Sequence, residues 1–213
     1  MSNPELRLFV DAQFMSPFAM SAFVALREKG APFLIDVVDL DAQQNLQPAY
    51  RARSVTCRVP TLAHGGFSVS ESSAITEYLE EVFPPPAYAA VYPQDPVARA
   101  RARQVQAWLR SDFMPIREER PTTVIFRQPS HQPLSQKARL SVQKLFEAAE
   151  SLLAPGADTL VGQWCIADLD LALMLNRLVA NGDPAPERLA AYVRRQWRRP
   201  SVQAWVELSR SKA

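Results

Sequence analysis

The sequence predicts an α/β domain followed by an all-helical domain, on the strength of three observations. Residues 6–38 have the pattern of a strand, a helix and a second strand. Residues 60–83 have the pattern of a hairpin followed by a helix. Beyond residue 96, apolar residues recur at helical rather than strand spacing. The 213 residues suffice for two small domains that share a contact surface, or for one compact unit.

The first strand and helix are marked by local signals. Residues 6–10 form a short β-rich run. Ser16-Pro17 then predicts a helix start, because a hydroxyl suits the N-cap and proline suits the first helical position. The helix is expected to run to about Lys29 and is apolar on nearly every side, so it should be buried. A glycine ends it, and residues 32–38 are predicted to form a strand parallel to the first.

The rest of the first domain is predicted in the same way. Residues 39–55 are polar and irregular, and Pro48 is placed to break any long helix. Two successive glycines mark the turn of a hairpin over residues 60–70, and a helix is expected from about Glu71. This order of elements is that of the thioredoxin fold, which we expect over residues 1–83.

The remainder of the chain is predicted to be a linker and an all-helical domain. Residues 84–95 are rich in proline and have no periodic pattern, which is typical of a linker. The helical domain is expected over residues 96–213. Pro115 is expected to kink its first helix. Helices are predicted near residues 105–116, 142–152, 166–179, 189–197 and 202–208.

Composition and charge point away from nucleic acids and membranes. Lys and Arg number 24 against 22 Asp and Glu, a net charge of +2, whereas a nucleic-acid binder of this size carries a larger, clustered excess. The arginines within 99–103 and 194–199 are interpreted as solvated helix faces, with an anion or partner patch as the alternative. No apolar stretch is long enough to span a bilayer, and the start lacks a secretory pattern. The expected location is cytoplasmic.

The inventory of cysteine and histidine predicts no metal site. Cys57 and Cys165 are the only cysteines, and His64 and His131 are the only histidines. Their spacing fits neither a disulfide framework nor a zinc knuckle. Cys57 is interpreted as incidental.

Three short motifs have both a structural and a functional interpretation. The Ser16 hydroxyl can simply cap its helix, but it can also donate to an anionic sulfur held at the positive helix end. Val59 can offer its backbone to a peptide-like ligand if the bond to Pro60 is cis. Glu71-Ser72 can be an ordinary helix start, or can bind the ammonium and carboxylate of an amino acid.

In order and spacing, residues 16–18, 58–62 and 70–75 resemble the glutathione site of the cytosolic glutathione transferases with a serine-type active site. The helix opening at residues 165–168 resembles the family's capping motif, although a cysteine stands where the family has serine or threonine. Residues 107–121 are similar to a bacterial YfcF-like subgroup. The resemblance covers essentially the whole chain. It implies the glutathione transferase fold, with a thioredoxin-like domain followed by an all-α domain.

The resemblance implies a role for each site residue. Ser16 would hydrogen-bond the glutathione sulfur, and Val59 would pair with the cysteinyl backbone beside a cis Pro60. Glu71 and Ser72 would hold the γ-glutamyl end.

Further candidate residues concern the glycyl end of glutathione and the second substrate. Gln47 is the first choice for holding the glycyl carboxylate and Arg58 the second. The second substrate is expected between the two domains, where the kinked helix would place Met114 and Arg117 as candidate walls. Glutathione would be the co-substrate, no metal would be needed, and the chain would form a homodimer.

The function implied is a glutathione transferase that activates the thiol for attack on electrophiles, with possible peroxidase activity toward organic hydroperoxides. Detoxification and protection from oxidative stress would follow from that chemistry. The alternatives are a glutathione-dependent disulfide reductase, an isomerase of a maleyl-type substrate, and a non-catalytic glutathione-binding or regulatory protein. The serine-serine-cysteine opening associated with that isomerase is absent from the sequence.

Overall fold

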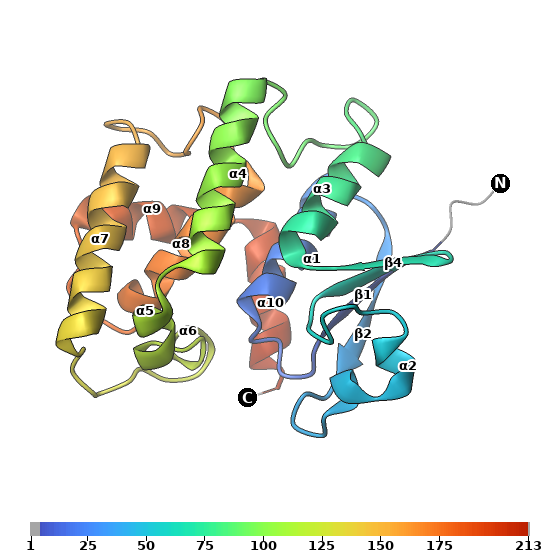
Figure 1. Cartoon of the computed structure of the whole chain (residues 1–213). Coiled ribbons are helices and arrows are strands. Elements are labelled where there is room, and N and C mark those ends of the chain that lie inside the picture. The colour runs from blue at the N-terminus through green and yellow to red at the C-terminus, as the bar shows by residue number, and fades with distance from the viewer. Residues whose placement is uncertain (1–4, 213) are drawn as a thin grey trace. The chain divides into compact units, whose positions relative to one another are not determined.

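The computed structural model describes residues 5–212 (Figure 1). These residues divide into two compact units, which we describe separately. One unit holds the chain up to Val91 together with Ala204–Lys212, and the other is Tyr92–Gln203. Within residues 5–212, no helix has the length and apolar content needed to cross a membrane. The domain limits proposed from the sequence stay predictions.

The first unit is built on a four-stranded sheet with the strand order β2-β1-β3-β4. β1 pairs with β2 in parallel and with β3 antiparallel, and β3 and β4 form an antiparallel hairpin. The order confirms the predicted β-α-β unit, hairpin and following helix. The elements are β1 (Leu6–Asp11), α1 (Pro17–Lys29), β2 (Phe33–Val38), the 3-10 helix η1 (Gln44–Leu46), α2 (Pro48–Arg51), β3 (Thr61–His64), β4 (Phe67–Ser70) and α3 (Ser72–Val82).

Helix α1 begins and ends at the residues that the sequence indicates. Ser16 is its N-cap, with extended backbone and a hydroxyl that accepts from the N–H of Ala19 at 3.2 Å. Pro17 occupies the first helical position. Gly30 ends the helix at φ 70°, a left-handed conformation that glycine adopts without strain. Most α1 side chains are buried, and the helix packs against β1 and α3.

Alternation along β1 sends successive side chains to opposite faces of the sheet. Leu6, Leu8 and Val10 are buried. Phe9 points to the other face, where its ring meets that of Tyr50 of α2 edge-on, with centroids 6.0 Å apart. The sheet therefore has an apolar contact on the α2 side as well.

Residues 39–55 are more regular than the sequence predicts. They contain η1 and α2, where irregular chain was expected. Pro48 starts α2 instead of interrupting a helix, because the first helical turn needs no N–H from that residue. The prediction of an irregular segment is therefore wrong for these two short helices.

The C-terminal segment returns to the first unit. Trp205 of α10 (Pro200–Arg210) is fully buried, and its ring lies 5.3 Å from each of the rings of Phe14 and Phe23. Phe14 belongs to the loop before α1 and Phe23 to α1 itself. The last helix thus packs on the start of α1, a contact that no sequence pattern indicates.

The second unit has helices as its regular structure, as predicted. Helix α8 is its centre, since almost all of its side chains are buried and it packs against α4, α6 and α9. Its bounds coincide with the predicted residues 166–179. The helices are α4 (Pro96–Ser111), α5 (Met114–Glu119), α6 (Thr123–Phe126), α7 (Gln136–Leu152), α8 (Ile166–Val179), α9 (Glu187–Trp197) and the first residues of α10.

Pro115 does not kink one long helix, so that prediction is wrong. Two helices, α4 and α5, are separated by Asp112 and Phe113, and Phe113 adopts the left-handed region at φ 66°. Pro115 lies in the first turn of α5, where its missing N–H costs nothing. The spacing of apolar residues over 105–116 is the same for one kinked helix and for two successive helices. For this reason the sequence pattern predicted one helix where the structure has two.

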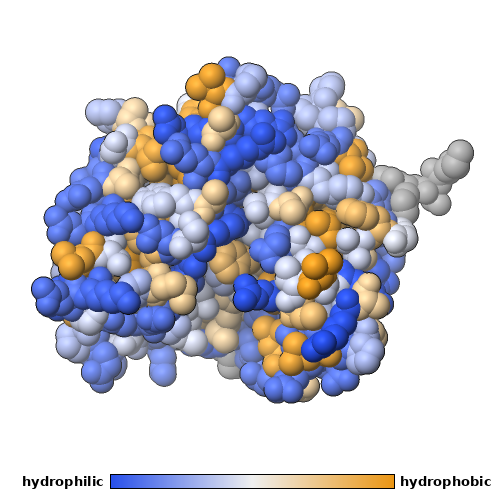
Figure 2. All heavy atoms as spheres, viewed as in Figure 1, coloured by the Kyte–Doolittle hydropathy of each residue, from blue (hydrophilic) through white to orange (hydrophobic). Residues whose placement is uncertain are grey.

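The surface is mixed. On the face seen in Figure 2, hydrophilic residues predominate and hydrophobic ones form small separate patches. Single exposed apolar residues such as Val55 and Val97 are normal on a folded protein. Arg194 and Arg195 on α9 are exposed and pair with Glu187 and Asp158, in keeping with a solvated helix face.

Candidate functional site

Ser16 lies half-buried at the N-terminal end of α1. The first turn of α1 contains no acidic residue, so no side chain of that turn neutralises the positive end of the helix dipole. The hydroxyl serves as a helix cap, and a hydroxyl can also donate its hydrogen to an anion placed at the same end. Both interpretations of Ser16 are compatible with this geometry.

Asp11 fixes the backbone of the loop that carries Ser16. Its two carboxylate oxygens accept from the N–H of Met15 at 2.7 Å and from the N–H of Ser16 at 3.0 Å. Asp11 is 6% exposed and ends β1. Sequence reasoning missed this residue; a carboxylate directly after a buried strand and before an N-cap is the signal that could have found it.

Val59 presents an unused backbone next to a cis peptide bond. The bond between Val59 and Pro60 is cis, as the resemblance implies. Among residues 5–212, neither the N–H nor the carbonyl of Val59 has a hydrogen-bond partner. Its side chain is buried against Val38 and Tyr50. The backbone of Val59 is therefore available to an extended, peptide-like ligand.

Glu71 and Ser72 form the start of α3. Glu71 is the exposed N-cap residue and adopts φ 74°, a region that is strained for a non-glycine residue. Its carbonyl accepts from Ile75 at 2.9 Å, while its side chain makes no capping hydrogen bond. Ser72 is the first helical residue and is 2% exposed. The strained backbone leaves the Glu71 carboxylate in solvent beside the helix N-terminus, where an amino-acid group can bind.

The strand registers bring these three motifs to one end of the sheet. Phe9 pairs with Thr61, so the end of β1 lies beside the start of β3. Thr61 pairs in turn with Ser70, so the end of β4 lies there as well. Because Ser16 follows β1, Val59 precedes β3 and Glu71 follows β4, all three belong to that end of the sheet.

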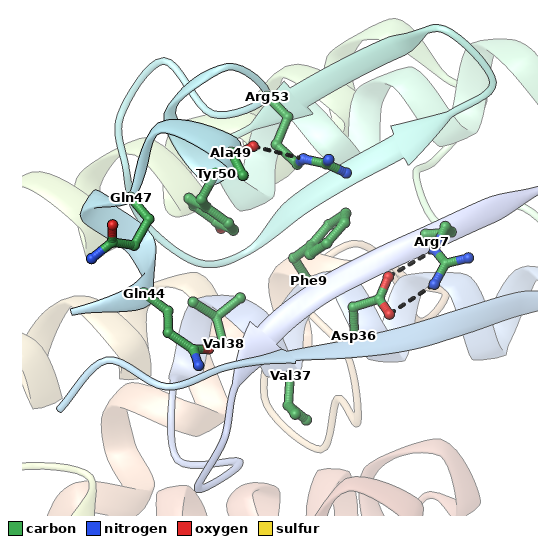
Figure 3. A pocket seen from close by; sticks show the side chains of 10 residues that line it. All are labelled: Arg7, Phe9, Asp36, Val37, Val38, Gln44, Gln47, Ala49, Tyr50 and Arg53. Carbon is green, nitrogen blue, oxygen red and sulfur yellow. Dashed lines mark hydrogen bonds and ion pairs between the residues drawn. The ribbon is translucent and has the colours of Figure 1, made fainter. Parts of the chain in front are cut away.

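Gln47 lies at the start of α2 and lines a pocket of 480 Å³ on the α2 side of the sheet. In Figure 3 its amide points away from Tyr50 and Phe9, and its side chain is exposed. The guanidinium of Arg53 lies over the Phe9 ring, 5.2 Å from its centre. The Arg58 side chain is exposed, whereas its carbonyl accepts from the Tyr50 hydroxyl at 2.9 Å. The choice between Gln47 and Arg58 as carboxylate ligand stays a prediction.

Met114 and Arg117 belong to the second unit. Met114 opens α5 and is 53% exposed. The Arg117 guanidinium donates to the carbonyls of Leu109 and Arg110, and thereby caps the C-terminal end of α4. Burial lowers the pKa of Arg117, and nearby Arg110 lowers it further. Arg117 thus has a structural role, and its role as a pocket wall stays a prediction.

The start of α8 is a capping box with cysteine at the N-cap. Asp168 accepts from the N–H of Cys165 at 2.9 Å, from the N–H of Leu160 at 2.8 Å and from the Tyr192 hydroxyl at 2.9 Å. Burial raises the pKa of Asp168, and these hydrogen bonds oppose the shift. The Cys165 sulfur faces the N–H of Asp168, but sulfur is a poor acceptor, so this half of the box is weak.

Among the described residues, no group of three or more His, Cys, Asp or Glu side chains is arranged to hold a metal ion. The groups at the end of the sheet are a hydroxyl, a free backbone segment and a helix start. Their chemistry is that of binding a peptide-like ligand and stabilising an anion.

Comparisons with protein families match nearly the whole chain. Residues 15–82 match the N-terminal domain of glutathione S-transferases, and residues 95–211 match the C-terminal domain of the same enzymes. A glutathione transferase homologue from Burkholderia gl BGR1, whose crystal structure has bound glutathione, is 49% identical. The likeness covers 98% of this chain and 100% of that one, with a TM-score of 0.80.

Other relatives are more distant. Human glutathione S-transferase theta-1 is 34% identical over 103 residues, which are 48% of this chain and 41% of that protein. Rat maleylacetoacetate isomerase is 29% identical over 157 residues, or 73% of this chain and 68% of the relative. The match thus spans about two fifths of the human transferase and about two thirds of the rat isomerase.

Proposed function

Because this chain belongs to the glutathione S-transferase family, we propose that it binds glutathione and activates the thiol for attack on small electrophiles. The observation that carries the proposal is the convergence of Ser16, the free backbone of Val59 and the start of α3 behind Glu71 at one end of a sheet. Glutathione has a thiol that suits Ser16, a peptide backbone that suits Val59, and an amino-acid end that suits the start of α3. The glutathione bound to the Burkholderia homologue supports this choice of ligand.

Ser16 is the proposed catalytic residue. Its hydroxyl donates to the glutathione sulfur, and the α1 dipole favours the thiolate over the thiol. A free thiol titrates near about 8.5, and lowering its pKa by roughly two units corresponds to about 2.7 kcal/mol. A hydrogen bond to a charged sulfur and a helix dipole together have that magnitude.

The remaining contacts position the ligand. Val59 pairs through its N–H and carbonyl with the cysteinyl backbone, which directs the sulfur toward Ser16. The Glu71 carboxylate binds the γ-glutamyl ammonium, while Ser72 and the first amides of α3 bind the carboxylate beside it. Gln47 is the proposed ligand of the glycyl carboxylate, with Arg58 as the second choice.

The reactions proposed share one nucleophile. In transfer, the thiolate forms a bond to an electrophilic carbon, and the leaving group departs with its electron pair. In peroxide reduction, the thiolate forms a bond to the terminal hydroperoxide oxygen as the O–O bond breaks, and the alkoxide leaves as the alcohol after taking up a proton. The glutathione sulfenic acid formed then reacts with a second glutathione, which yields glutathione disulfide and water. Met114 and Arg117 are the proposed walls for the second substrate.

The proposed enzyme is of the serine type, of the YfcF-like subgroup, cytoplasmic and a homodimer. Disulfide reduction and non-catalytic glutathione binding are the alternatives. Isomerisation is a second candidate because maleylacetoacetate isomerase is among the relatives. The same thiolate would add to the double bond and leave again after rotation.

The experiment that tests the proposal is retention on glutathione-agarose, followed by assays with an aryl halide and with cumene hydroperoxide. We expect retention and turnover of at least one substrate. Retention without turnover of either would favour the binding protein. Absence of both retention and turnover would contradict the proposed function.

A further inference from the structure

Three hydroxyl groups converge on one backbone carbonyl, that of Arg58. The Tyr50 hydroxyl lies 2.9 Å from this oxygen, the Thr61 hydroxyl 3.1 Å and the Ser54 hydroxyl 3.4 Å. Thr61 is also 3.0 Å from both other hydroxyls. All three side chains are buried. A carbonyl has two lone pairs and each hydroxyl one hydrogen, so Tyr50, with the shortest contact, is the principal donor.

This network holds both flanks of the segment proposed to bind glutathione. Arg58 directly precedes Val59, and Thr61 directly follows Pro60. The Tyr50 hydroxyl contacts the first flank through the Arg58 carbonyl and the second through the Thr61 hydroxyl. The backbone of Val59 itself has no hydrogen-bond partner among the described residues, so its orientation depends on these neighbours.

The ring of Tyr50 also stabilises the same segment, through packing contacts. It packs against the side chains of Val38 and Val59, and meets the Phe9 ring edge-on. Figure 3 shows Tyr50 between Gln47 and Phe9. Tyr50 belongs to α2, a helix of four residues that is too short to be stable by itself. The tyrosine therefore joins α2 to the sheet at the point where Val59 is presented.

We propose that Tyr50 is a positioning residue for glutathione, acting through the Arg58 carbonyl to fix the direction of the Val59 N–H and carbonyl. This inference rests on the proposed function. In this role Tyr50 acts through Val59, because it holds the Val59 segment in one orientation before binding and so lowers the entropy that binding costs. Burial raises the pKa of the Tyr50 phenol, so the hydroxyl keeps its hydrogen throughout the neutral range.

The test is Tyr50→Phe, which removes the hydroxyl and keeps the ring against Phe9. Tyr78→Phe is the matched control, because the Tyr78 hydroxyl makes a 2.8 Å hydrogen bond to His64 in the same unit but does not contact the network. In calorimetric titrations of the full chain, we expect the Kd of glutathione to rise about five-fold in Tyr50→Phe, the equivalent of one hydrogen bond. The control should keep the wild-type Kd.

Kinetics separate positioning from chemistry. Tyr50→Phe should raise the KM for glutathione about as much as the Kd. It should leave kcat at saturating glutathione and the pKa of the bound thiol at their wild-type values. Thr61→Val should also weaken binding, and the double variant should lose less than the product of the two single effects, because both act in one network.

Two results overturn the inference alone. One is a Tyr50→Phe variant that binds glutathione with the wild-type Kd but has a lower melting temperature, which would make the network purely structural. The other is an equal loss of affinity in Tyr78→Phe. If the wild-type chain itself fails to bind glutathione, the proposed function is overturned and this inference with it.

Discussion

The carboxylate of Asp11 accepts a 3.0 Å hydrogen bond from the backbone N–H of Ser16. Its other oxygen accepts from Met15 at 2.7 Å, so one buried side chain fixes two consecutive amides before α1. Asp11 therefore fixes the orientation of the Ser16 hydroxyl toward a ligand at the N-terminal end of α1.

Replacement of Asp11 should lower the stability of the folded chain. Asp11→Ala leaves two backbone donors without their acceptor, and we expect the free energy of unfolding to fall by about 2 kcal/mol. Asp11→Asn keeps one acceptor oxygen but turns an NH2 donor toward the other N–H, so we expect a loss of similar size. Urea unfolding of the two variants measures this. A loss below about 0.5 kcal/mol in both would show that the paired acceptors are not what Asp11 contributes.

Local signals in the sequence sufficed for much of the fold. Ser16-Pro17 and Gly30 mark both ends of α1, because caps depend on the residues at the terminus itself. Helix α8 is largely apolar, and its bounds were predicted residue for residue. The cis bond at Val59-Pro60 was implied only by the resemblance to a family.

What the sequence could not predict depends on contacts between separate helices, strands and loops. Trp205 packs on Phe14, and Tyr50 donates to Arg58, through tertiary contacts that no periodic pattern encodes. The break at Phe113 was missed because apolar spacing continues through it. At the candidate site, residue types were predictable from motifs, and the place of Asp11 between β1 and the N-cap is a usable signal. The hydroxyl network beside Val59 has no such signal in the sequence.

The buried pair of Lys29 and Glu80 predicts a large effect of a single substitution. The two side chains lie 2.8 Å apart and are 0% and 2% exposed, and Lys29 also donates to the carbonyls of Phe83 and Ala89. Lys29→Met should lower the free energy of unfolding by about 3 kcal/mol or more, because it leaves a buried carboxylate without its cation. Urea unfolding measures the loss.

The control for that substitution is Lys144→Met. Lys144 pairs with Asp112 at the surface, and its side chain is 60% exposed, so the loss should stay below about 1 kcal/mol. The double variant Lys29→Met/Glu80→Gln should be more stable than Lys29→Met alone. A double variant that is less stable would contradict the account of an uncompensated buried charge.

The ion pair of Arg7 and Asp36 predicts a dependence on pH. Hydrogen bonds from Arg7 at 2.8 and 2.9 Å hold the pKa of Asp36 below its usual 3.8. Because the carboxyl pKa is lower in the folded than in the unfolded chain, ionised Asp36 stabilises the fold at pH values above the unfolded-state pKa. This contribution is lost as the pH falls through the folded-state pKa. Both side chains are partly exposed, so Asp36→Asn should cost only about 0.5–1 kcal/mol at pH 7.

The measurement for Asp36→Asn is urea unfolding from pH 7 down to pH 3. The difference from wild type should shrink as the wild-type carboxyl takes up its proton. A difference that stays constant or grows toward pH 3 would show that Asp36 acts through packing instead of charge.

Cys165→Ser should stabilise the chain by about 0.5–1 kcal/mol. A serine oxygen accepts from the N–H of Asp168 better than the sulfur does, and so restores the weak half of the capping box. Calorimetric unfolding measures the change, with Cys57→Ser as the control for loss of a thiol. A lowered melting temperature in Cys165→Ser alone would count against this capping picture.

If Ser16 stabilises the thiolate of bound glutathione as proposed, the pKa of that thiol must depend on the Ser16 hydroxyl. Ultraviolet absorption of the thiolate, followed across pH in the complex, reports this pKa. We expect it to lie roughly two units below about 8.5 in the wild-type complex and to return toward 8.5 in Ser16→Ala. Turnover should then fall much more than glutathione affinity. An unshifted thiol pKa in the wild-type complex, or equal losses of affinity and turnover in Ser16→Ala, would contradict the claim.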